Sequence, residues 1–397
     1  MSKILFISRY PITFEGHGGY HRTYQIYHEL CQAFGDDQVD ILALNGNYLS
    51  PNDNKSHSTQ SLYLREIQDR LALLFEIIKE KGSPYRVLKY LLTNAYPSLW
   101  SNQPARSLYE NQISQKGIPK VCLIEHPAFG SVLPINQSLG IHTVACFQNF
   151  EAFDQNIEYY DNTHTLPLFV LKFIQELDIL KQCKACITIS KTEAGLLGGL
   201  GLNAVYHPYI PVGEIQENFF KIREERKKNN PDPNMFLIIG TATHKPTGDG
   251  IRWFLEQVTT HGLPEQIQII ICGRGTEDLI RQPEQIPGIT VKGWVENIEL
   301  SELLLRANSV LVPQATGFGA LTKITDMACA GLTILTSTHP TYAIEIPPSS
   351  ITIENDWNHW TRKINELSLI PSQESTSYDE WYESHPRNLI PLIEKLL

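Results

Sequence analysis

The sequence predicts an α/β protein with two doubly wound parallel sheets, one in each half of the chain. Short segments of almost unbroken apolar residues recur along the sequence, with helical patterns between most of them. Strands of this kind are buried on both faces, as in parallel sheets, and their alternation with helices indicates α/β units. The two halves also open alike, because the apolar segments 3–8 and 235–240 each lead into a glycine-bearing loop and a helix-like stretch.

The length and composition fit two globular domains. A chain of 397 residues is too long for one ordinary hydrophobic core. With 42% hydrophobic and 19% charged residues, it does not belong to the disordered class. The proline-rich exit 207–213 marks a boundary, and we interpret the charged stretch 214–230 that follows it as a solvated helix or linker. We place the first domain at 1–210, the second at 211–370 and a C-terminal segment at 371–397.

The hydrophobic patterns predict the elements of each domain in order. In the first domain a helix is expected near 20–34, further strands near 39–44, 120–125, 142–147 and 185–190, and further helices near 62–81, 168–182 and 192–199. In the second domain a helix is expected near 250–258, strands near 267–272, 289–292, 308–312 and 332–336, and helices near 298–307 and 322–330. A last helix is predicted over 378–397.

The charge balance limits the choice of ligands. Net charge is −10, so a nucleic-acid binder with a broad basic face is not expected. Residues 1–210 hold 17 basic against 19 acidic side chains, while 211–397 hold 16 against 24. The second domain thus carries most of the negative charge. An anionic ligand there must be held by a few well-placed groups rather than by a broad positive field.

Cysteine usage and the absence of long apolar segments predict a cytoplasmic protein. The seven cysteines are odd in number, and several lie within apolar runs, as reduced buried thiols do. Cys183 and Cys186 form a lone C-x-x-C, which without further ligands is weak evidence for a metal. The N-terminal apolar run is too short for a signal peptide, and no segment has the length of a membrane span.

The aromatic, basic stretch 84–105 fits an acceptor-pocket cover, a peripheral membrane or partner contact, or an ordinary packed insertion.

Two loops of the first domain carry candidate binding groups, because ligands of open parallel sheets bind at the carboxyl ends of the strands. The loop 16–22 (GHGGYHR) follows the opening strand, and Gly18 and Gly19 would let backbone N–H groups approach an anion. The alternative is a tight turn that simply needs glycine. His126 follows another strand and could position a sugar hydroxyl or a developing charge. Its alternative is a hydrogen-bonded loop histidine.

The second domain carries more such groups at its strand exits. Lys245 lies in the first strand–helix loop beside a helix N-terminus, and Arg274 follows the next strand, so both are candidate phosphate ligands. In the stretch 313–331, Gly317 and Gly319 form a glycine loop that leads into a helix. On that helix Lys323 could offset diphosphate charge and Asp326 could accept hydrogen bonds from a ribose.

The ordered set of these motifs resembles the retaining GT-B glycosyltransferases of the large fourth family, which use nucleotide-activated sugars. GFGALTKITDMACAG is similar to the family's glycine loop and acid-bearing helix, and HKPTGDGIRWFL to its first donor-domain loop and helix. CGRG and KGWV (292–295) follow in the family's order. In the first half, GHGGYHR resembles the acceptor-domain glycine loop, CFQNFEAFD the Asn-x-Glu strand exit, and ELDILKQCKACITISKTE the usual Glu, Asp and strand-Ser run. The resemblance spans the chain to about residue 370.

The resemblance implies a GT-B fold of two facing Rossmann-like domains, with a C-terminal helix that crosses back onto the first domain. It implies transfer of a hexose, with retention, from a UDP- or GDP-sugar to a glycan, lipid-linked or small-molecule acceptor, as in polysaccharide biosynthesis. The donor would lie on the second domain, with no cofactor and no metal ion, since the sequence has no D-x-D motif. The family roles map onto the matching positions as follows: Asp326 to ribose; Lys245, Arg274 and Lys323 to phosphates; the backbone at Trp294 and Val295 to the base; Gly317 and Gly319 to the donor loop; and Gly18, Gly19 and His126 to the sugar and acceptor. Of these we assign His126, Lys245 and Asp326 to the catalytic set.

Three positions depart from the family pattern. The usual acid eight residues before Asp326 is Phe318, and Thr316 precedes the glycine loop. The helix acid is Asp rather than the common Glu, and an Arg common after the first donor-domain strand is Thr241. The missing acid normally holds the donor sugar, so the donor stays open. Two alternatives follow: a GT-B-like chain that binds a nucleotide or partner without catalysis, and a sugar-nucleotide epimerase on the same fold.

Overall fold

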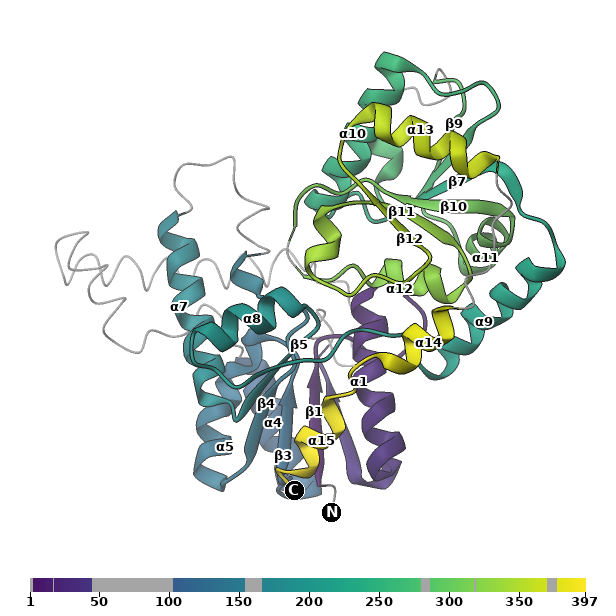
Figure 1. Cartoon of the computed structure of the whole chain (residues 1–397). Coiled ribbons are helices and arrows are strands. Elements are labelled where there is room, and N and C mark those ends of the chain that lie inside the picture. The colour runs from purple at the N-terminus through teal and green to yellow at the C-terminus, as the bar shows by residue number, and fades with distance from the viewer. Residues whose placement is uncertain are drawn as a thin grey trace, which may run out of the picture.

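The computed structural model describes residues 3–16, 18–44, 103–153, 166–279, 286–317, 319–369 and 377–397. It contains two separate six-stranded sheets, each fully parallel and each flanked by helices (Figure 1). The strands of the first sheet lie between residues 4 and 206, and those of the second between 232 and 353. The two doubly wound α/β domains predicted from the sequence are therefore present.

The first sheet has the strand order β2-β1-β3-β4-β5-β6, and the order reverses beside β1. Its strands are β1 (Ile4–Ser8), β2 (Val39–Ala43), β3 (Val121–Ile124), β4 (His142–Ala145), β5 (Ala185–Thr188) and β6 (Ala204–Tyr206). Its helices are α1 (Gly18–Phe34), α4 (Gln103–Lys116), α5 (Leu133–Leu139), α7 (Leu166–Gln182) and α8 (Lys191–Gly199), with 3₁₀ turns η1 (Asp36–Gln38) and η2 (Pro127–Val132).

The second sheet has the order β12-β11-β10-β7-β8-β9, reversing between β10 and β7. Its strands are β7 (Asp232–Ile239), β8 (Gln268–Cys272), β9 (Ile289–Gly293), β10 (Ala307–Val312), β11 (Thr333–Ser337) and β12 (Ser350–Ile353). The helices are α9 (Gly213–Lys228), α10 (Lys245–His261), α11 (Asn297–Arg306), α12 (Thr322–Cys329) and α13 (Trp357–Ser368), with 3₁₀ turns η3 (Thr276–Asp278) and η5 (His339–Tyr342).

The middle of each sheet is buried on both faces because β1 and the second half of β7 are apolar at successive positions. On β1, Ile4 and Phe6 pack with α1 on one face, while Leu5 and Ile7 pack with η2 and α4 on the other. On β7, Phe236 and Ile238 pack with α10 and α13, whereas Met235 and Leu237 face α9, α11 and α12. Successive strand residues point to opposite faces, so one unbroken apolar run supplies two cores.

The predicted elements inside the described ranges are present, and the differences have physical causes. β6 (AVY) is only three residues long, and β12 (SITI) alternates polar and apolar residues, so neither has the long apolar run by which the other strands were predicted. Helices α4, α5 and α13 were not predicted; α4 is polar over most of its length. The expected helix 62–81 and nearly all of the stretch 84–105 lie outside the described residues.

The prediction of a single helix over 378–397 was wrong, because two short helices form there. They are α14 (Ser377–Ser384) and α15 (Leu389–Glu394), and Pro386 lies between them, where a continuing helix would need its N–H. Tyr378 and Tyr382 of α14 belong to a second-domain core, while Leu389 and Ile393 of α15 belong to the first-domain core beside α1. The yellow C-terminal segment in Figure 1 thus runs from one domain down onto the other.

The charged stretch 214–230 forms most of α9, and it is only partly solvated. Arg226 is 6% exposed, and its guanidinium donates to the carbonyls of Ala307 (2.6 Å) and Leu304. It also approaches the Gly331 carbonyl at 3.4 Å, so one side chain binds the ends of α11 and α12 together.

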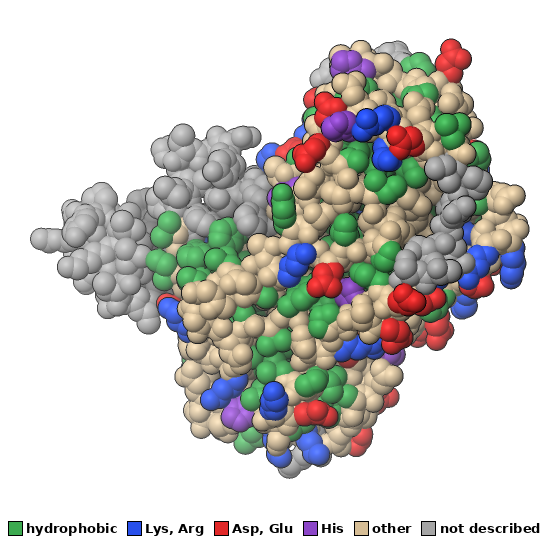
Figure 2. All heavy atoms as spheres, in the orientation of Figure 1, with side chains coloured by type: hydrophobic (Ala, Val, Ile, Leu, Met, Phe, Trp, Pro, Cys, Tyr) green, Lys and Arg blue, Asp and Glu red, His purple; other side chains and the backbone are tan. Residues whose placement is uncertain are grey.

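Outward-facing acidic and basic side chains gather on the flank formed by α9 and α14 (Figure 2). Among the described residues, no helix is long and apolar enough to cross a membrane.

Replacing Arg226 with Met is expected to lower the free energy of unfolding of the second domain by about 2–4 kcal/mol, because buried carbonyls lose a charged donor. Urea denaturation followed by circular dichroism measures the change. Lys227→Met on the same helix is the control, since the exposed pair of Lys227 with Glu224 contributes less than about 1 kcal/mol. Equal denaturation midpoints for the two variants would contradict the anchoring role of Arg226.

Candidate functional site between the two domains

Helices α1 and α12, one from each domain, meet at their N-terminal turns (Figure 1). A Cβ atom added to Gly18 at the start of α1 would collide with Oγ1 of Thr322 at the start of α12. Glycine at this position therefore lets the two backbones approach. Both helices follow the carboxyl ends of strands, so their contact brings the two ligand-binding edges face to face.

Two more contacts join the domains around this point. Gly319, with φ of +81°, lies against the side chain of Asn149, which follows β4 of the first domain. Elsewhere, the backbone N–H of Lys191 donates to the Ala343 carbonyl at 2.8 Å, and the Thr192 hydroxyl donates to the Tyr342 carbonyl. The glycine loop of the second domain is thus placed directly against the first domain.

Lys323 is the most unusual cation at the site. It is the second residue of α12, and its Nζ donates to the Ile239 carbonyl at 3.1 Å, at the end of β7. Burial lowers the pKa of this lysine to about 8. Within the described ranges no carboxylate pairs with it. A partly desolvated ammonium group without a carboxylate can be neutralised by a bound anion, so this position is suited to a phosphate.

The loops around Lys323 are packed backbone to backbone. A Cβ on Gly250 would collide with the Pro313 carbonyl, so helix α10 lies directly on the exit of β10. The Thr247 hydroxyl donates to Gln314 Oε1 at 3.3 Å, which joins the same two segments through side chains. Gly317, with φ of +120°, borders Pro246 at the start of α10. The N-terminus of α10 and the glycine loop therefore form one continuous rim beside Lys323.

Lys245 is placed differently. Its Nζ lies 2.6 Å from Asp249 Oδ2 one turn along α10, and Asp249 also accepts from Arg252 at 2.6 Å. The side chains of this cluster are more than a third exposed. The two lysines that the sequence pattern treats alike thus differ in their partners: Lys245 belongs to a half-exposed ion-pair cluster, whereas Lys323 donates to a backbone carbonyl.

Arg274 and Trp294 lie together at the exits of β8 and β9. The Arg274 guanidinium is 5.5 Å from the centre of the Trp294 ring, a cation–π contact, and the indole is 55% exposed. The Arg274 carbonyl accepts from Ala242 N at 2.8 Å, which links this loop to the β7 exit. Val295 packs against the second-domain core. An exposed aromatic face topped by a cation is a surface on which a planar base can stack.

Asp326 is buried at 4% exposure and faces the first domain. Its Oδ1 accepts from the Tyr209 hydroxyl at 2.6 Å, and His21 Nδ1 lies 3.1 Å from its Oδ2. Burial, reinforced by the charge of Asp326, raises the pKa of Tyr209, which therefore stays a donor. The residue predicted to bind ribose thus already holds α1 and the interdomain segment.

The first-domain edge is built around a buried carboxylate that was not among the predicted site residues. Glu125 accepts from the Thr23 hydroxyl, from Gln148 Nε2 at 3.0 Å and from the Arg9 backbone N–H at 2.8 Å. Burial raises the pKa of Glu125. Gln148 Nε2 also donates to the Gly19 carbonyl at 2.9 Å, so the glycine loop is fixed to this edge.

His126 has a structural role as well as a position at the edge. Its Nδ1 accepts from the Ala128 backbone N–H at 3.0 Å, which caps η2, and its Nε2 lies 3.6 Å from Glu151 Oε1. The alternative that the sequence left open for His126, a hydrogen-bonded loop histidine, therefore holds for its Nδ1 atom. The Nε2 side lies among polar groups of the first-domain edge, near Glu151.

Several groups of this site escaped the sequence reasoning. His21 belongs to the GHGGYHR loop, but only its glycines were considered as ligands. Asn149 lies in the CFQNFEAFD motif and Gln314 in the stretch 313–331, both directly after strands, but neither residue was assigned a role. Tyr209 lies in the proline-rich boundary segment and had none. Phe318, in the position of the family's acid, lies outside the described residues, and Thr316 is exposed.

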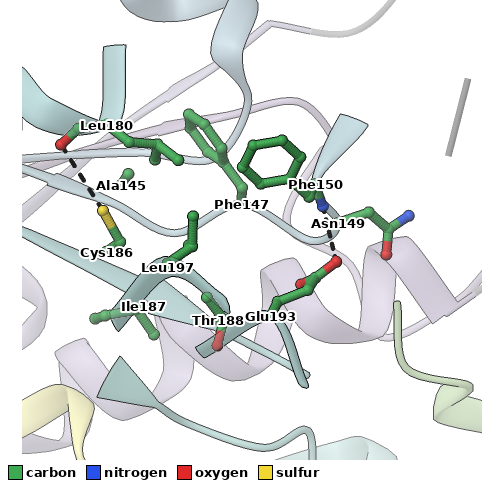
Figure 3. Close-up of a pocket in the computed structure, with 10 residues that line it drawn as sticks. All are labelled: Ala145, Phe147, Asn149, Phe150, Leu180, Cys186, Ile187, Thr188, Glu193 and Leu197. Atoms are coloured by element: carbon green, nitrogen blue, oxygen red, sulfur yellow. Dashed lines mark hydrogen bonds between the residues drawn. The ribbon is translucent and has the colours of Figure 1, made fainter. Parts of the chain in front are cut away.

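The cavity drawn in Figure 3 lies inside the first domain, beside β4, β5, α7 and α8, and does not belong to this site. Its volume is about 10 Å³, which accommodates about one water molecule. Glu193 at its rim accepts from the Phe150 backbone N–H at 2.9 Å. It is therefore a packing gap. In the described part of the chain, no group of three or more His, Cys, Asp or Glu side chains is placed to hold a metal ion.

The chain has the GT-B fold of glycosyltransferases, as comparison with solved structures shows. No family model matches the sequence, and no curated protein sequence matches it significantly. Sucrose-phosphate synthase from Thermosynechococcus elongatus matches with a TM-score of 0.61 at 14% identity, over 93% of this chain and 90% of that one. A glycosyltransferase from Rickettsia africae matches with 0.56 at 12%, over 100% and 97%. Anabaena HepE, solved with UDP and glucose, matches with 0.57 at 10%, over 100% and 99%.

The contact of Gly18 with Thr322 gives a testable prediction about domain closure. Gly18→Ala is expected to separate the ends of α1 and α12, because its Cβ would occupy the place of the Thr322 hydroxyl. Hydrogen exchange of the amides at the start of α12 should accelerate, and the double variant Gly18→Ala with Thr322→Ala should restore protection.

Gly195→Ala is the matched control for this variant. A Cβ at Gly195, inside α8, meets nothing within 4 Å. Unchanged exchange in Gly18→Ala, or a double variant that remains unprotected, would show that the close approach does not depend on glycine.

Proposed function

We propose that this protein is a glycosyltransferase that moves a hexose from a nucleoside-diphosphate sugar to a glycan, lipid-linked or small-molecule acceptor. The observation that carries the proposal is Lys323. Its half-buried side chain has no carboxylate partner among the described residues, and its Nζ lies at the edge where the second sheet faces the glycine loop of the first domain. The GT-B fold and the donor-loop motifs support the same conclusion.

In this proposal the diphosphate binds between Lys323 and the N-termini of α10 and α12, with Lys245 and Arg274 at its outer side. Helix N-termini and buried cations favour anions, and a glycine-lined rim lets the backbone approach them. The base would stack near Trp294 and Val295, and the ribose would lie towards Asp326. HepE was solved with UDP and glucose, which supports a UDP-sugar as the first donor to try; GDP- and ADP-sugars are the others.

The proposed reaction is a same-face substitution with retention. The acceptor oxygen bonds to the anomeric carbon while the bond from that carbon to the donor phosphate breaks, and the acceptor proton passes to a phosphate oxygen. Charge then accumulates on the departing diphosphate, where Lys323 and the helix N-termini stabilise it. His126 and the Gly18–Gly19 loop would face the sugar and the acceptor. Because protein groups stabilise the diphosphate charge in this proposal, the proposed transfer is independent of a metal ion.

The panel experiment uses UDP-, GDP- and ADP-sugars with and without candidate acceptors, and follows release of the nucleoside diphosphate. We expect slow donor hydrolysis by the wild type that Asp326→Ala and Lys245→Ala abolish or reduce at least about tenfold. Arg252→Ala, which leaves the pair of Lys245 with Asp249 in place, is the control. Tight nucleotide binding with no release from any donor, after an acceptor panel, would instead favour the non-catalytic alternative suggested by Thr316 and Phe318. Conversion of the sugar without release would favour the epimerase.

A second prediction concerns pH. The pKa of Lys323 is about 8 in the free protein, so the ammonium group is charged below that pH and becomes neutral above it. Affinity for a nucleoside diphosphate should therefore be level near pH 7 and fall above pH 8, by up to about tenfold per unit. Calorimetric titration between pH 6.5 and 9.5 measures the profile.

The control variants isolate Lys323 in this profile. Lys323→Met should bind weakly at all pH values and lose the decline. Lys292→Met removes the same charge at a surface pair with Glu299 and should keep the wild-type profile. A decline that persists in Lys323→Met would assign the titration to another group.

A further inference from the structure

The Asp326 carboxylate joins two groups that do not belong to its own domain. His21 on α1 and Tyr209 on the interdomain segment each contact one of its oxygens, at 3.1 and 2.6 Å. Asp326 and His21 are separated by 305 residues in the sequence. The rings of His21 and Tyr209 are stacked, with their centres 6.4 Å apart, so the two donors approach the carboxylate as a pair.

The two donors are held by one buried unit of the first domain. Arg22 and Gln25 on α1 both donate to the Pro208 carbonyl, at 3.3 and 3.1 Å, next to Tyr209. Gln25 also donates to Glu29 at 2.9 Å, and Glu29 lies 3.1 Å from His207 Nε2. The helix that carries His21 thus also fixes the segment that carries Tyr209. Arg22 donates to Gln25 Oε1 at 2.6 Å, so the opposite charges of Arg22 and Glu29 are linked through Gln25.

A carboxylate held in this way can still accept a ligand. Its two oxygens offer about four lone-pair directions, and the protein uses one on each oxygen. Asp326 lies one turn after Thr322 and Lys323 on α12, so its free directions belong to the same helix end as the proposed phosphate site. Fixing the side chain in advance removes the entropy cost of ordering it when a hydroxyl arrives.

We propose that His21 and Tyr209 are positioning residues: they hold the Asp326 carboxylate for a ribose hydroxyl of the donor, and by the same contacts they keep the two domains closed. The ribose part of this proposal rests on the proposed function. The closure part does not, because it concerns the protein without ligand.

The ligand-free test is small-angle X-ray scattering of Tyr209→Phe, which removes only the hydroxyl on Asp326, and of His21→Leu. Both should increase the radius of gyration. Tyr109→Phe is the matched control, because it also removes a buried tyrosine hydroxyl, one that donates to Asn136 within the first domain. A Tyr209→Phe variant as compact as Tyr109→Phe would overturn the closure part, whether or not any nucleotide binds.

The ligand test measures calorimetric affinity for UDP, GDP and ADP and the donor kinetics of the same variants. Tyr209→Phe and His21→Leu should each lower the affinity for the nucleotide that the wild type binds by at least about tenfold, since each removes a hydrogen bond to a charged group. The donor KM should rise with kcat nearly unchanged, because ribose lies away from the reacting bond. His21→Asn, whose amide can donate near the Nδ1 position, should recover most of the affinity.

Three results would overturn the ribose part. Wild-type affinity in Tyr209→Phe would show that the carboxylate needs no positioning. Tighter nucleotide binding in the variants would show that His21 and Tyr209 compete with the ribose. A wild type that binds none of the three nucleotides would remove the proposed function together with the ribose part, while the scattering result would still decide closure.

Discussion

Helices α1 and α12 touch at their N-terminal turns, and the placement of the candidate groups follows from that contact. In a parallel sheet every strand ends at the same edge, so each domain alone offers one row of loops. A site with walls on two sides requires the two rows to face each other at van der Waals distance. Gly18 makes this possible because it has no side chain where Thr322 lies. The contact then places Asn149 against Gly319 and His21 against Asp326.

The closed arrangement is supported away from the site by elements that belong to both domains. Helix α14 packs in the second domain and α15 in the first, and the turn at Pro386 redirects the chain between them. Arg22 and Gln25 fix the segment that leads from the first domain to α9, and Tyr382 of α14 donates to the Pro211 carbonyl of the same segment at 3.2 Å. These polar contacts add to the apolar packing of α14 and α15 because a hydrogen bond to a specific carbonyl defines a direction, which apolar contacts alone do not.

The sequence was sufficient for the fold because most strands of both sheets contain nearly unbroken apolar runs, and such runs have few other interpretations. It was insufficient for β6, which has only three residues, for β12, which alternates polar and apolar residues, and for the break between α14 and α15. The loops of the site were predicted from glycines after strands. The pairs that define the site, such as Asp326 with His21 and with Tyr209, were not. Nothing local marks a residue whose partner lies 305 or 117 positions away.

The contrast between Lys245 and Lys323 shows why residue type and motif alone do not rank candidate ligands. Both lysines lie at helix N-termini after strands, yet Lys245 is paired with Asp249 at the surface, while Lys323 is half-buried and donates to a backbone carbonyl. Salt and water screen the first charge far more than the second. The second domain has an excess of acidic residues, but no carboxylate pairs with Lys323 among the described residues. A single half-buried cation can therefore determine the local potential at the site, even in the more acidic domain.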